Sequence, residues 1–225
     1  MVIWIIFGAF ILLSFIVSNQ LKSKFKKYSK IPIDSGLSGA EVATKMLHDN
    51  GIYDVKIIST PGKLTDHYNP TNKTVNLSQA VYGSRSVAAA AIAAHECGHA
   101  IQHAKAYSML NLRSELVPIV SFASKWVQWV ILAGILLVQA FPQLLLAGIV
   151  LFALTTLFSI ITLPVEVDAS RRALSWLSNA GITSGTNHKY AKDALKWAAY
   201  TYFIAALTSI ATLVYYILIF MGARD

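Results

Sequence analysis

Two histidines four residues apart, with a glutamate directly after the first, form the segment of this chain with the clearest chemical meaning. His95, Glu96 and His99 match the pattern H-E-x-x-H, which zinc peptidases carry on a helix. Residues i and i+4 share one face of a helix, so both imidazoles can bind one ion. Glu96 can then act as general base on a zinc-activated water that attacks a peptide carbonyl. The pattern predicts one catalytic zinc ion per chain, which still needs a third protein ligand.

Three residues are candidates for that third ligand: His103, Glu166 and Asp168. On a continuous helix His103 lies about 12 Å from His95 along the axis, which is too far for both to bind one ion. Glu166 lies at the edge of an apolar stretch, where an acidic residue needs an explanation such as a metal. The alternative is a carboxylate that stabilises a helix N-terminus, which Pro164 could open. We predict that His95, His99 and Glu166 bind the zinc ion.

Other polar residues could orient these ligands or stabilise the transition state. Asp168 could accept a hydrogen bond from a ring N–H of His95 or His99, and a surface salt bridge with a nearby arginine is the alternative. His103 is expected beside the site, as a neighbour of the ligands or simply as a polar residue. Peptide hydrolysis also needs a donor for the developing oxyanion. The candidates for this donor are His67, Arg171, Arg172, His188 and Tyr190.

Four apolar stretches, each long enough to cross a bilayer, must position these residues. Hydrophobic residues make up 55% of the 225 residues and charged residues 13%, which is too apolar for an ordinary soluble domain. The stretches run roughly over residues 2–21, 117–140, 144–163 and 197–221. The first has no basic segment before it and no cleavage site after it, so we expect a retained anchor. The sequence thus predicts a mainly α-helical, polytopic membrane protein.

The formal charge of +8 is distributed by region and does not indicate nucleic-acid binding. Residues 22–125 carry 13 of the 19 Lys and Arg, residues 164–196 carry 5, and Arg224 is the last. The connection 139–143 carries none. With four spans, both basic regions share one side of the membrane and both termini the other. The positive-inside rule predicts that the basic side is cytoplasmic, and two crossings return Glu166 to the side of the histidines.

The region between the first two spans is predicted to form a small α+β domain. Ser38 and Glu41 form a capping box that begins a helix over 39–50. Three short runs bounded by turn residues predict an antiparallel sheet, and an alanine-rich helix carries the H-E-x-x-H pattern. The runs are 54–60, 64–68 and 74–78, and the helix is about 86–107. Peptidases commonly hold substrate as an added strand on a sheet edge, so 64–68 or 74–78 could bind substrate; a bracing role for the sheet is the alternative.

This organisation divides the chain into five parts. They are a first transmembrane helix (1–21), a zincin-like catalytic domain (22–116), a transmembrane hairpin (117–163), a third-ligand helix with a loop (164–196) and a last transmembrane helix with the C-terminus (197–225). The single cysteine, Cys97, rules out an internal disulfide and is expected to be a small buried side chain.

Several segments together resemble the YugP-type bacterial membrane zinc metallopeptidases, a gluzincin-like family of neutral peptidases. The segments are AHECGHAIQ (94–102), LPVEVDASRRA (163–173), DHYNP (66–70) and VNLS (75–78), and the similarity extends over essentially the whole chain. The resemblance implies that His95, His99 and Glu166 are zinc ligands and Glu96 the catalytic base, in a bacterial inner membrane. The more distant HtpX-type proteases have an aspartate that supports the site four residues after the ligand glutamate. This chain has Ser170 at that position, so the resemblance does not imply such an aspartate here.

The combined expectation is a membrane-bound, zinc-dependent endopeptidase that acts at the membrane surface. Its partners would be the lipid bilayer and polypeptide substrates, either membrane proteins or chains close to the membrane. The first alternative is a catalytically silent zinc-binding scaffold, but a structural site would not need Glu96. The second is a transporter, suggested by Gln128 and Gln139 in a span; the absence of a paired charge in mid-span disfavours it.

Overall fold

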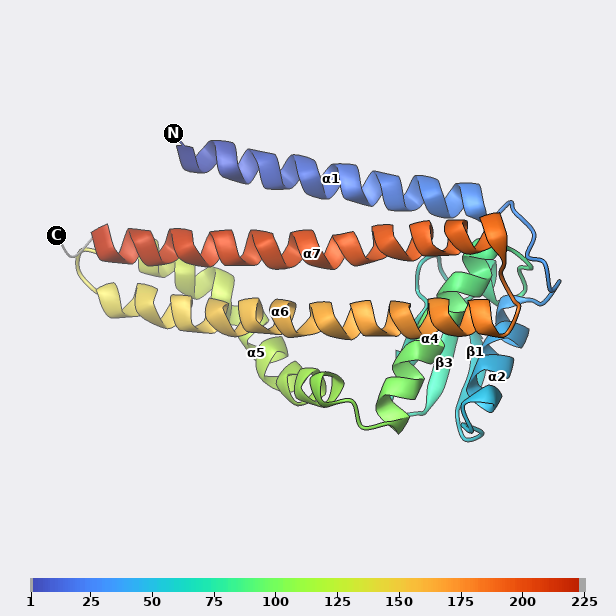
Figure 1. Ribbon diagram of the computed structural model, residues 1–225. Coiled ribbons are helices and arrows are strands. Elements are labelled where there is room, and N and C mark those ends of the chain that lie inside the picture. Colours follow the sequence, from blue (N-terminus) through green and yellow to red (C-terminus); the bar gives the residue numbers. More distant parts are fainter. Residues whose placement is uncertain (1, 223–225) are drawn as a thin grey trace. The chain divides into compact units, whose positions relative to one another are not determined.

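The computed structural model describes residues 2–222 (Figure 1). Side chains are described for residues 5–222. Met1 and residues 223–225 lie outside the described residues, and with them Arg224 and the two chain ends that are predicted to share one side of the membrane. The described helices are α1 (Val2–Tyr28), α2 (Gly39–Asp49), α3 (Gln79–Tyr82), α4 (Val87–Ala104), α5 (Ser108–Leu136), α6 (Pro142–Asn179) and α7 (Gly185–Gly222). The strands are β1 (Lys56–Thr60), β2 (His67–Asn69) and β3 (Thr74–Ser78). The prediction of a mainly helical protein is confirmed.

Four of the described helices, α1, α5, α6 and α7, are long and apolar enough to cross a membrane. Helices α6 and α7 have 38 residues each. At about 1.5 Å per residue, each is about 57 Å long and exceeds the hydrocarbon core of about 30 Å. About 20 residues suffice to cross the hydrocarbon core, so each helix is longer than a crossing requires.

The chain consists of two compact units, and each of these four helices contributes to both. Unit 1 holds the described part of residues 1–15, Asn111–Pro164 and residues 202–222. In it, small residues bring helix backbones close together. A Cβ on Gly134 of α5 would lie 2.6 Å from the Cα of Leu145 in α6, and Thr156 of α6 bonds Ser209 of α7 through hydroxyl oxygens 2.7 Å apart. Such contacts favour association of apolar helices.

Unit 2 (Ile16–Leu110 and Val165–Thr201) contains a three-stranded mixed sheet in the order β1-β3-β2. Strand β1 pairs in parallel with β3, and β2 pairs with β3 in the antiparallel direction. The predicted sheet was purely antiparallel, and that prediction is wrong. After β1 the chain forms β2 at the opposite edge of the sheet and then returns as the central strand β3. Strands β1 and β3 therefore run in the same direction.

The strand boundaries also differ from the prediction at the second strand. Strand β2 begins at His67, whereas the sequence predicted 64–68. Leu64 has a φ of 57°, in the left-handed region that an extended strand does not use. Strand β3 matches 74–78 and has a neighbour on each side. It therefore has no free edge, and the prediction that it could receive substrate is wrong.

Helix α4 packs its alanine-rich surface in the core of unit 2. Its N-cap is Ser86, whose side chain accepts from the N–H of Ala89, and it ends at Ala104 because Ala106 has a φ of 48°. The predicted capping box of α2 is confirmed, with Ser38 and Glu41 bonded to one another. Small side chains along α4 let α2 approach it closely. The buried members of this surface are Ala89, Ala90, Ala91, Ala93, Ala94, Cys97 and Ala100.

Helix α6 is continuous through Pro164. The prediction that a new helix begins there is therefore wrong, and Glu166 lies in the helix interior instead of a first turn. Proline removes one N–H donor from the helix, and apolar helices of membrane proteins tolerate this loss. The same helix thus carries both an apolar span and the polar residues that follow it.

Candidate metal centre

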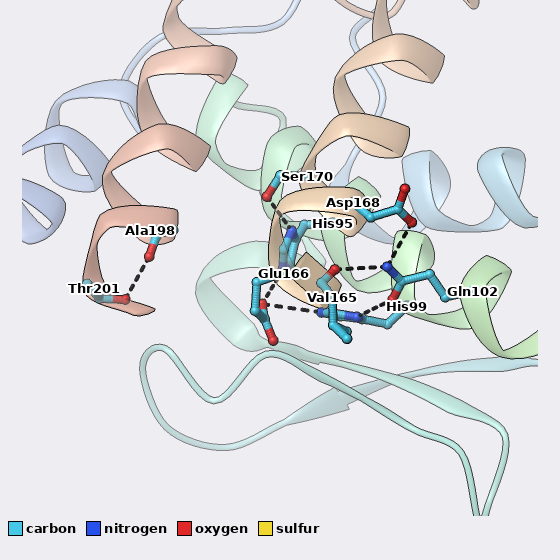
Figure 2. A network of polar contacts seen from close by, with 9 residues as sticks. All are labelled: His95, His99, Gln102, Val165, Glu166, Asp168, Ser170, Ala198 and Thr201. Carbon is cyan, nitrogen blue, oxygen red and sulfur yellow. Dashed lines mark hydrogen bonds and ion pairs between the residues drawn. The ribbon is translucent and has the colours of Figure 1, made fainter. Parts of the chain in front are cut away.

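His95, Glu96 and His99 lie on α4, and the two histidine rings are neighbours on one face of the helix (Figure 2). Their ring centroids are 4.8 Å apart, with the rings nearly perpendicular. Glu96 is 8% exposed and His99 is also 8% exposed. The i, i+4 spacing thus places two imidazoles side by side in a sheltered position, as the pattern requires.

Glu166 of α6 reaches both histidines with the same carboxylate oxygen. Its Oε2 lies 3.2 Å from Nε2 of His95 and 3.5 Å from Nε2 of His99. Ligand atoms of all three residues lie within 4.8 Å of one another. Two ligands bound at about 2.0 to 2.1 Å in a tetrahedral arrangement are about 3.3 Å apart. The two distances from Glu166 are close to this value, so its carboxylate oxygen is placed to bind one zinc ion together with the histidines.

A glycine allows α4 and α6 to approach closely enough for this arrangement. A Cβ on Gly98 would lie 2.6 Å from the carbonyl oxygen of Ala169 and 3.0 Å from its Cα. These are backbone atoms, which a side-chain rotation cannot move away. Gly98 lies between His95 and His99 in the sequence, so the close contact of α4 with α6 occurs at the site itself.

Gln102 determines which nitrogen of His99 faces Glu166. It is fully buried, and its Nε2 donates to the carbonyl of Val165 at 2.8 Å and to Oδ2 of Asp168 at 2.9 Å. Both partners are acceptors, so the amide nitrogen must face them and Oε1 must face His99. Oε1 lies 3.0 Å from Nδ1 of His99. Since Oε1 can only accept, Nδ1 carries the proton, and Nε2 is left to bind a metal.

This tautomer provides a test of whether a cation fits the site. When His99 is neutral, Nε2 presents a lone pair to the carboxylate oxygen of Glu166, and two acceptors face one another. The arrangement is favourable only with positive charge between or on the two groups. In the chain alone, burial lowers the pKa of His99, but the hydrogen bond with Glu166 and the charge of Glu96 outweigh burial and raise this pKa. The donor set therefore suits a divalent cation.

His95 is oriented by a different residue, Ser170 of α6. The hydroxyl of Ser170 lies 3.1 Å from Nδ1 of His95, which leaves Nε2 toward Glu166. Of the two predicted alternatives for Asp168, the salt bridge with an arginine is confirmed, because its carboxylate bonds Arg171 and Arg172. This carboxylate also accepts from Gln102, and it does not bond His95 or His99 directly. Asp168 acts on His99 only through Gln102, because it lies on another face of α6.

The remaining predicted residues have other partners. Arg171 and Arg172 both bond the carboxylate of Asp168. His103 bonds the hydroxyl of Tyr68 on β2, at 2.8 Å. The Nδ1 of His67 lies 2.8 Å from the carbonyl oxygen of Thr65. Two further oxyanion candidates also have other contacts: Nδ1 of His188 lies 3.1 Å from Oγ1 of Thr183, and the ring of Tyr190 stacks on Tyr28.

Gln102 and Ser170 are not among the site residues that the sequence predicts. Helical spacing could have identified both. Gln102 follows His99 by three residues and Ser170 follows Glu166 by four, so each lies on the face of its helix that carries the ligand. The residue types alone do not indicate a role in the site, because amide and hydroxyl side chains are common on helix surfaces.

Comparison with known proteins agrees with this geometry. The sequence model of a family described as "Putative neutral zinc metallopeptidase" matches residues 3–221. The chain belongs to this family. It is also similar to the "Putative membrane protease YugP" of Bacillus subtilis (strain 168), with 42% identity over 213 residues, which is 95% of this chain and 94% of that protein. No solved structure matches the chain. Family membership implies zinc, and His95, His99 and Glu166 are the described residues whose spacing suits it.

Proposed function

We propose that this protein is a membrane-bound, zinc-dependent endopeptidase. The observation that carries the proposal is the meeting of His95, His99 and Glu166, from two helices, with Glu96 beside them. Two histidines, one carboxylate and an adjacent glutamate make a catalytic zinc site with an open fourth position. Family membership supports the same reaction class.

Each residue of the site has a separate role in the proposed reaction. His95, His99 and Glu166 would hold the ion, and Gln102 and Ser170 orient the two rings. A zinc ion bound there would polarise a water molecule and a substrate carbonyl. Glu96 takes a proton from the attacking water and delivers it to the leaving amine.

Strand β2 is the sheet edge best placed to hold a substrate. It is an edge strand, and it contacts α4 through the bond between Tyr68 and His103. An extended peptide added to this edge would form main-chain hydrogen bonds and run beside the metal helix. This geometry favours unfolded or extended segments of polypeptide as substrates, from membrane proteins or from chains close to the membrane.

We further propose that the site lies on the cytoplasmic side of a bacterial inner membrane. The support is the basic content of residues 22–125 and 164–196 and the positive-inside rule. Unit 2 contains the polar sheet and the parts of α6 and α7 that follow or precede their apolar spans. This content favours a site at the membrane surface over one at membrane depth.

Zinc content tests the ligand set. Purified wild-type protein should hold close to one zinc per chain, and Glu166→Ala should lose most of it, because two histidines alone bind zinc weakly. His103→Ala is the matched control, since His103 lies on the same helix but bonds Tyr68, and it should keep its zinc. Stoichiometric zinc in Glu166→Ala would place the third ligand elsewhere.

Cleavage tests the reaction itself. Glu96→Gln should keep zinc and fold normally but cleave an unfolded membrane polypeptide about 100- to 10,000-fold more slowly, the range expected for loss of a general base. The competing function is a catalytically silent zinc-binding scaffold. If wild type and Glu96→Gln cleave a set of unfolded substrates at the same rate, with or without zinc, the scaffold would be favoured.

A further inference from the structure

A groove of about 550 Å³ lies between α6 and α7 within unit 2. Its walls come from residues between Val167 and Asn179 of α6 and between His188 and Ala199 of α7, and we call it the α6–α7 groove. Figure 1 shows the two helices side by side in this region. None of the three candidate zinc ligands is among its lining residues, so the groove is a separate feature.

The charged residues that line the α6–α7 groove are all basic. Arg171 comes from α6, and Lys192 and Lys196 come from α7, with His188 at the same wall. Lys192 and Lys196 are exposed, and the ammonium of Lys196 lies 5.4 Å from the ring centroid of Tyr200. No acidic side chain is among the described lining residues. The groove therefore attracts an anion.

Nearby carboxylates do not neutralise this charge. Asp168 bonds Arg171, but it is shared with Arg172, so one carboxylate faces two guanidinium groups. The side chain of Arg171 remains 78% exposed. Asp193 adjoins a groove lysine in sequence, but it bonds Nζ of Lys24 at 2.8 Å and also accepts from the hydroxyl of Tyr28.

The groove also has an apolar end that continues toward the membrane spans. Val167, which is 48% exposed, follows the span predicted to end at Leu163, and Ala199 lies just inside the span predicted to begin at Trp197. Arg171 lies about 6 Å farther along α6 than Val167, since a helix rises about 1.5 Å per residue. The groove residues nearest to the predicted spans are thus apolar, and the basic residues lie farther from the spans, which is the order of acyl chain and head group.

We propose that the α6–α7 groove binds an anionic phospholipid. Its phosphate would contact Arg171, Lys192 and Lys196, and its acyl chains would lie along Val167 and Ala199. Basic pockets between membrane helices at the polar surface bind anionic head groups in this way. Ser170 lines the groove and also bonds His95, so the lipid would lie next to a residue that orients a candidate ligand.

Lipid binding to the purified full-length chain tests the proposal. Single-lipid binding is measured by native mass spectrometry with phosphatidylglycerol and, separately, with phosphatidylcholine of the same acyl chains. Phosphatidylglycerol should bind more tightly. Replacing two groove lysines, in Lys192→Gln with Lys196→Gln, should weaken its binding about 25-fold, because each basic residue near an anionic surface contributes about fivefold.

The matched control replaces two exposed juxtamembrane lysines outside the groove, Lys22→Gln with Lys26→Gln. This variant should keep its affinity for phosphatidylglycerol within about twofold, and both variants should keep the unfolding midpoint of the wild type. Equal binding of the two lipids, or equal loss in the two variants, would overturn the proposal. Complete displacement of the lipid by millimolar inorganic phosphate would do so as well, because it would identify a site for free phosphate.

Discussion

At the scale of single residues, Gln102 is the side chain of the site whose orientation is most constrained by its hydrogen-bond partners. Its amide has one orientation that satisfies Val165, Asp168 and His99 together. A hydroxyl such as Ser170 can donate or accept and adapts to its partner. Gln102 therefore determines which nitrogen of the His99 ring carries the proton, whereas Ser170 can bond either tautomer of His95.

Removal of the Gln102 amide should weaken zinc binding. Gln102→Met keeps the length of the side chain but leaves Nδ1 of His99 without its acceptor, and loss of such a contact typically costs 10- to 100-fold in metal affinity. The zinc dissociation constant of purified protein, measured by competition with a chelator of known affinity, gives the size of the effect. His103→Gln, one residue further along α4, is the control and should bind zinc normally. Unchanged affinity in Gln102→Met would show that the amide is a packing group only.

The chemistry of the site was easier to predict than the contacts that support it. H-E-x-x-H has one chemical meaning, and Glu166 stood out as an acidic residue beside an apolar stretch. The bonds of Asp168 with Arg171 and Arg172 are i,i+3 and i,i+4 contacts along α6, so helical spacing allowed them to be predicted as one alternative. The contact of Asp168 with Gln102 could not be predicted, because it depends on the packing of α4 against α6.

At the scale of elements, the contact between α4 and α6 depends on the absence of a side chain at residue 98. Gly98→Ala should force the helices apart, because its Cβ would lie 2.6 Å from a backbone oxygen. Overpacking of this kind costs about 1 to 3 kcal/mol, and the displaced Glu166 should bind zinc less well. Thermal unfolding and zinc content in detergent measure both effects. Gly83→Ala, where nothing lies within 4 Å of the added Cβ, should change neither.

The capping box of α2 predicts a pH dependence of stability. The backbone N–H of Ser38 and then its hydroxyl donate to the carboxylate of Glu41 and lower the pKa of Glu41 below its usual value. A lowered pKa in the folded state stabilises the protein above the unfolded-state pKa of about 4.3, and the contribution is lost as the pH falls. Wild type should therefore be more stable than Glu41→Gln at pH 7, and the gap should narrow toward pH 3.5. A gap that widens on acidification would contradict the assignment.

The elements themselves were predicted with uneven success for physical reasons. Capping residues and alanine-rich periodicity are local signals, so α2 and α4 were found within a few residues. The direction of β1 relative to β3 depends on where β2 inserts, which is a non-local property. Proline favours the first turn of a helix, so the sequence predicts a helix start at Pro164, but apolar helices of membrane proteins tolerate proline in their interior.

At the scale of the whole molecule, the proposed topology makes one prediction about accessibility. An engineered cysteine at Lys26→Cys should be protected from a membrane-impermeant maleimide in intact cells, and Gln139→Cys in the short connection should react. Native Cys97 need not be removed, because it is fully buried and burial raises the pKa of its thiol well above the usual value. Labelling of residue 26 from outside intact cells would reverse the proposed orientation.

The division of the candidate ligands between α4 and α6 also has a consequence for biosynthesis. A ribosome releases both histidines and Glu96 long before Glu166, and two apolar spans must be made in between. On the proposed function, the nascent chain carries a base and two ligands but no competent centre until the hairpin of those spans is inserted. Proteolysis would then begin only after those two spans have been made.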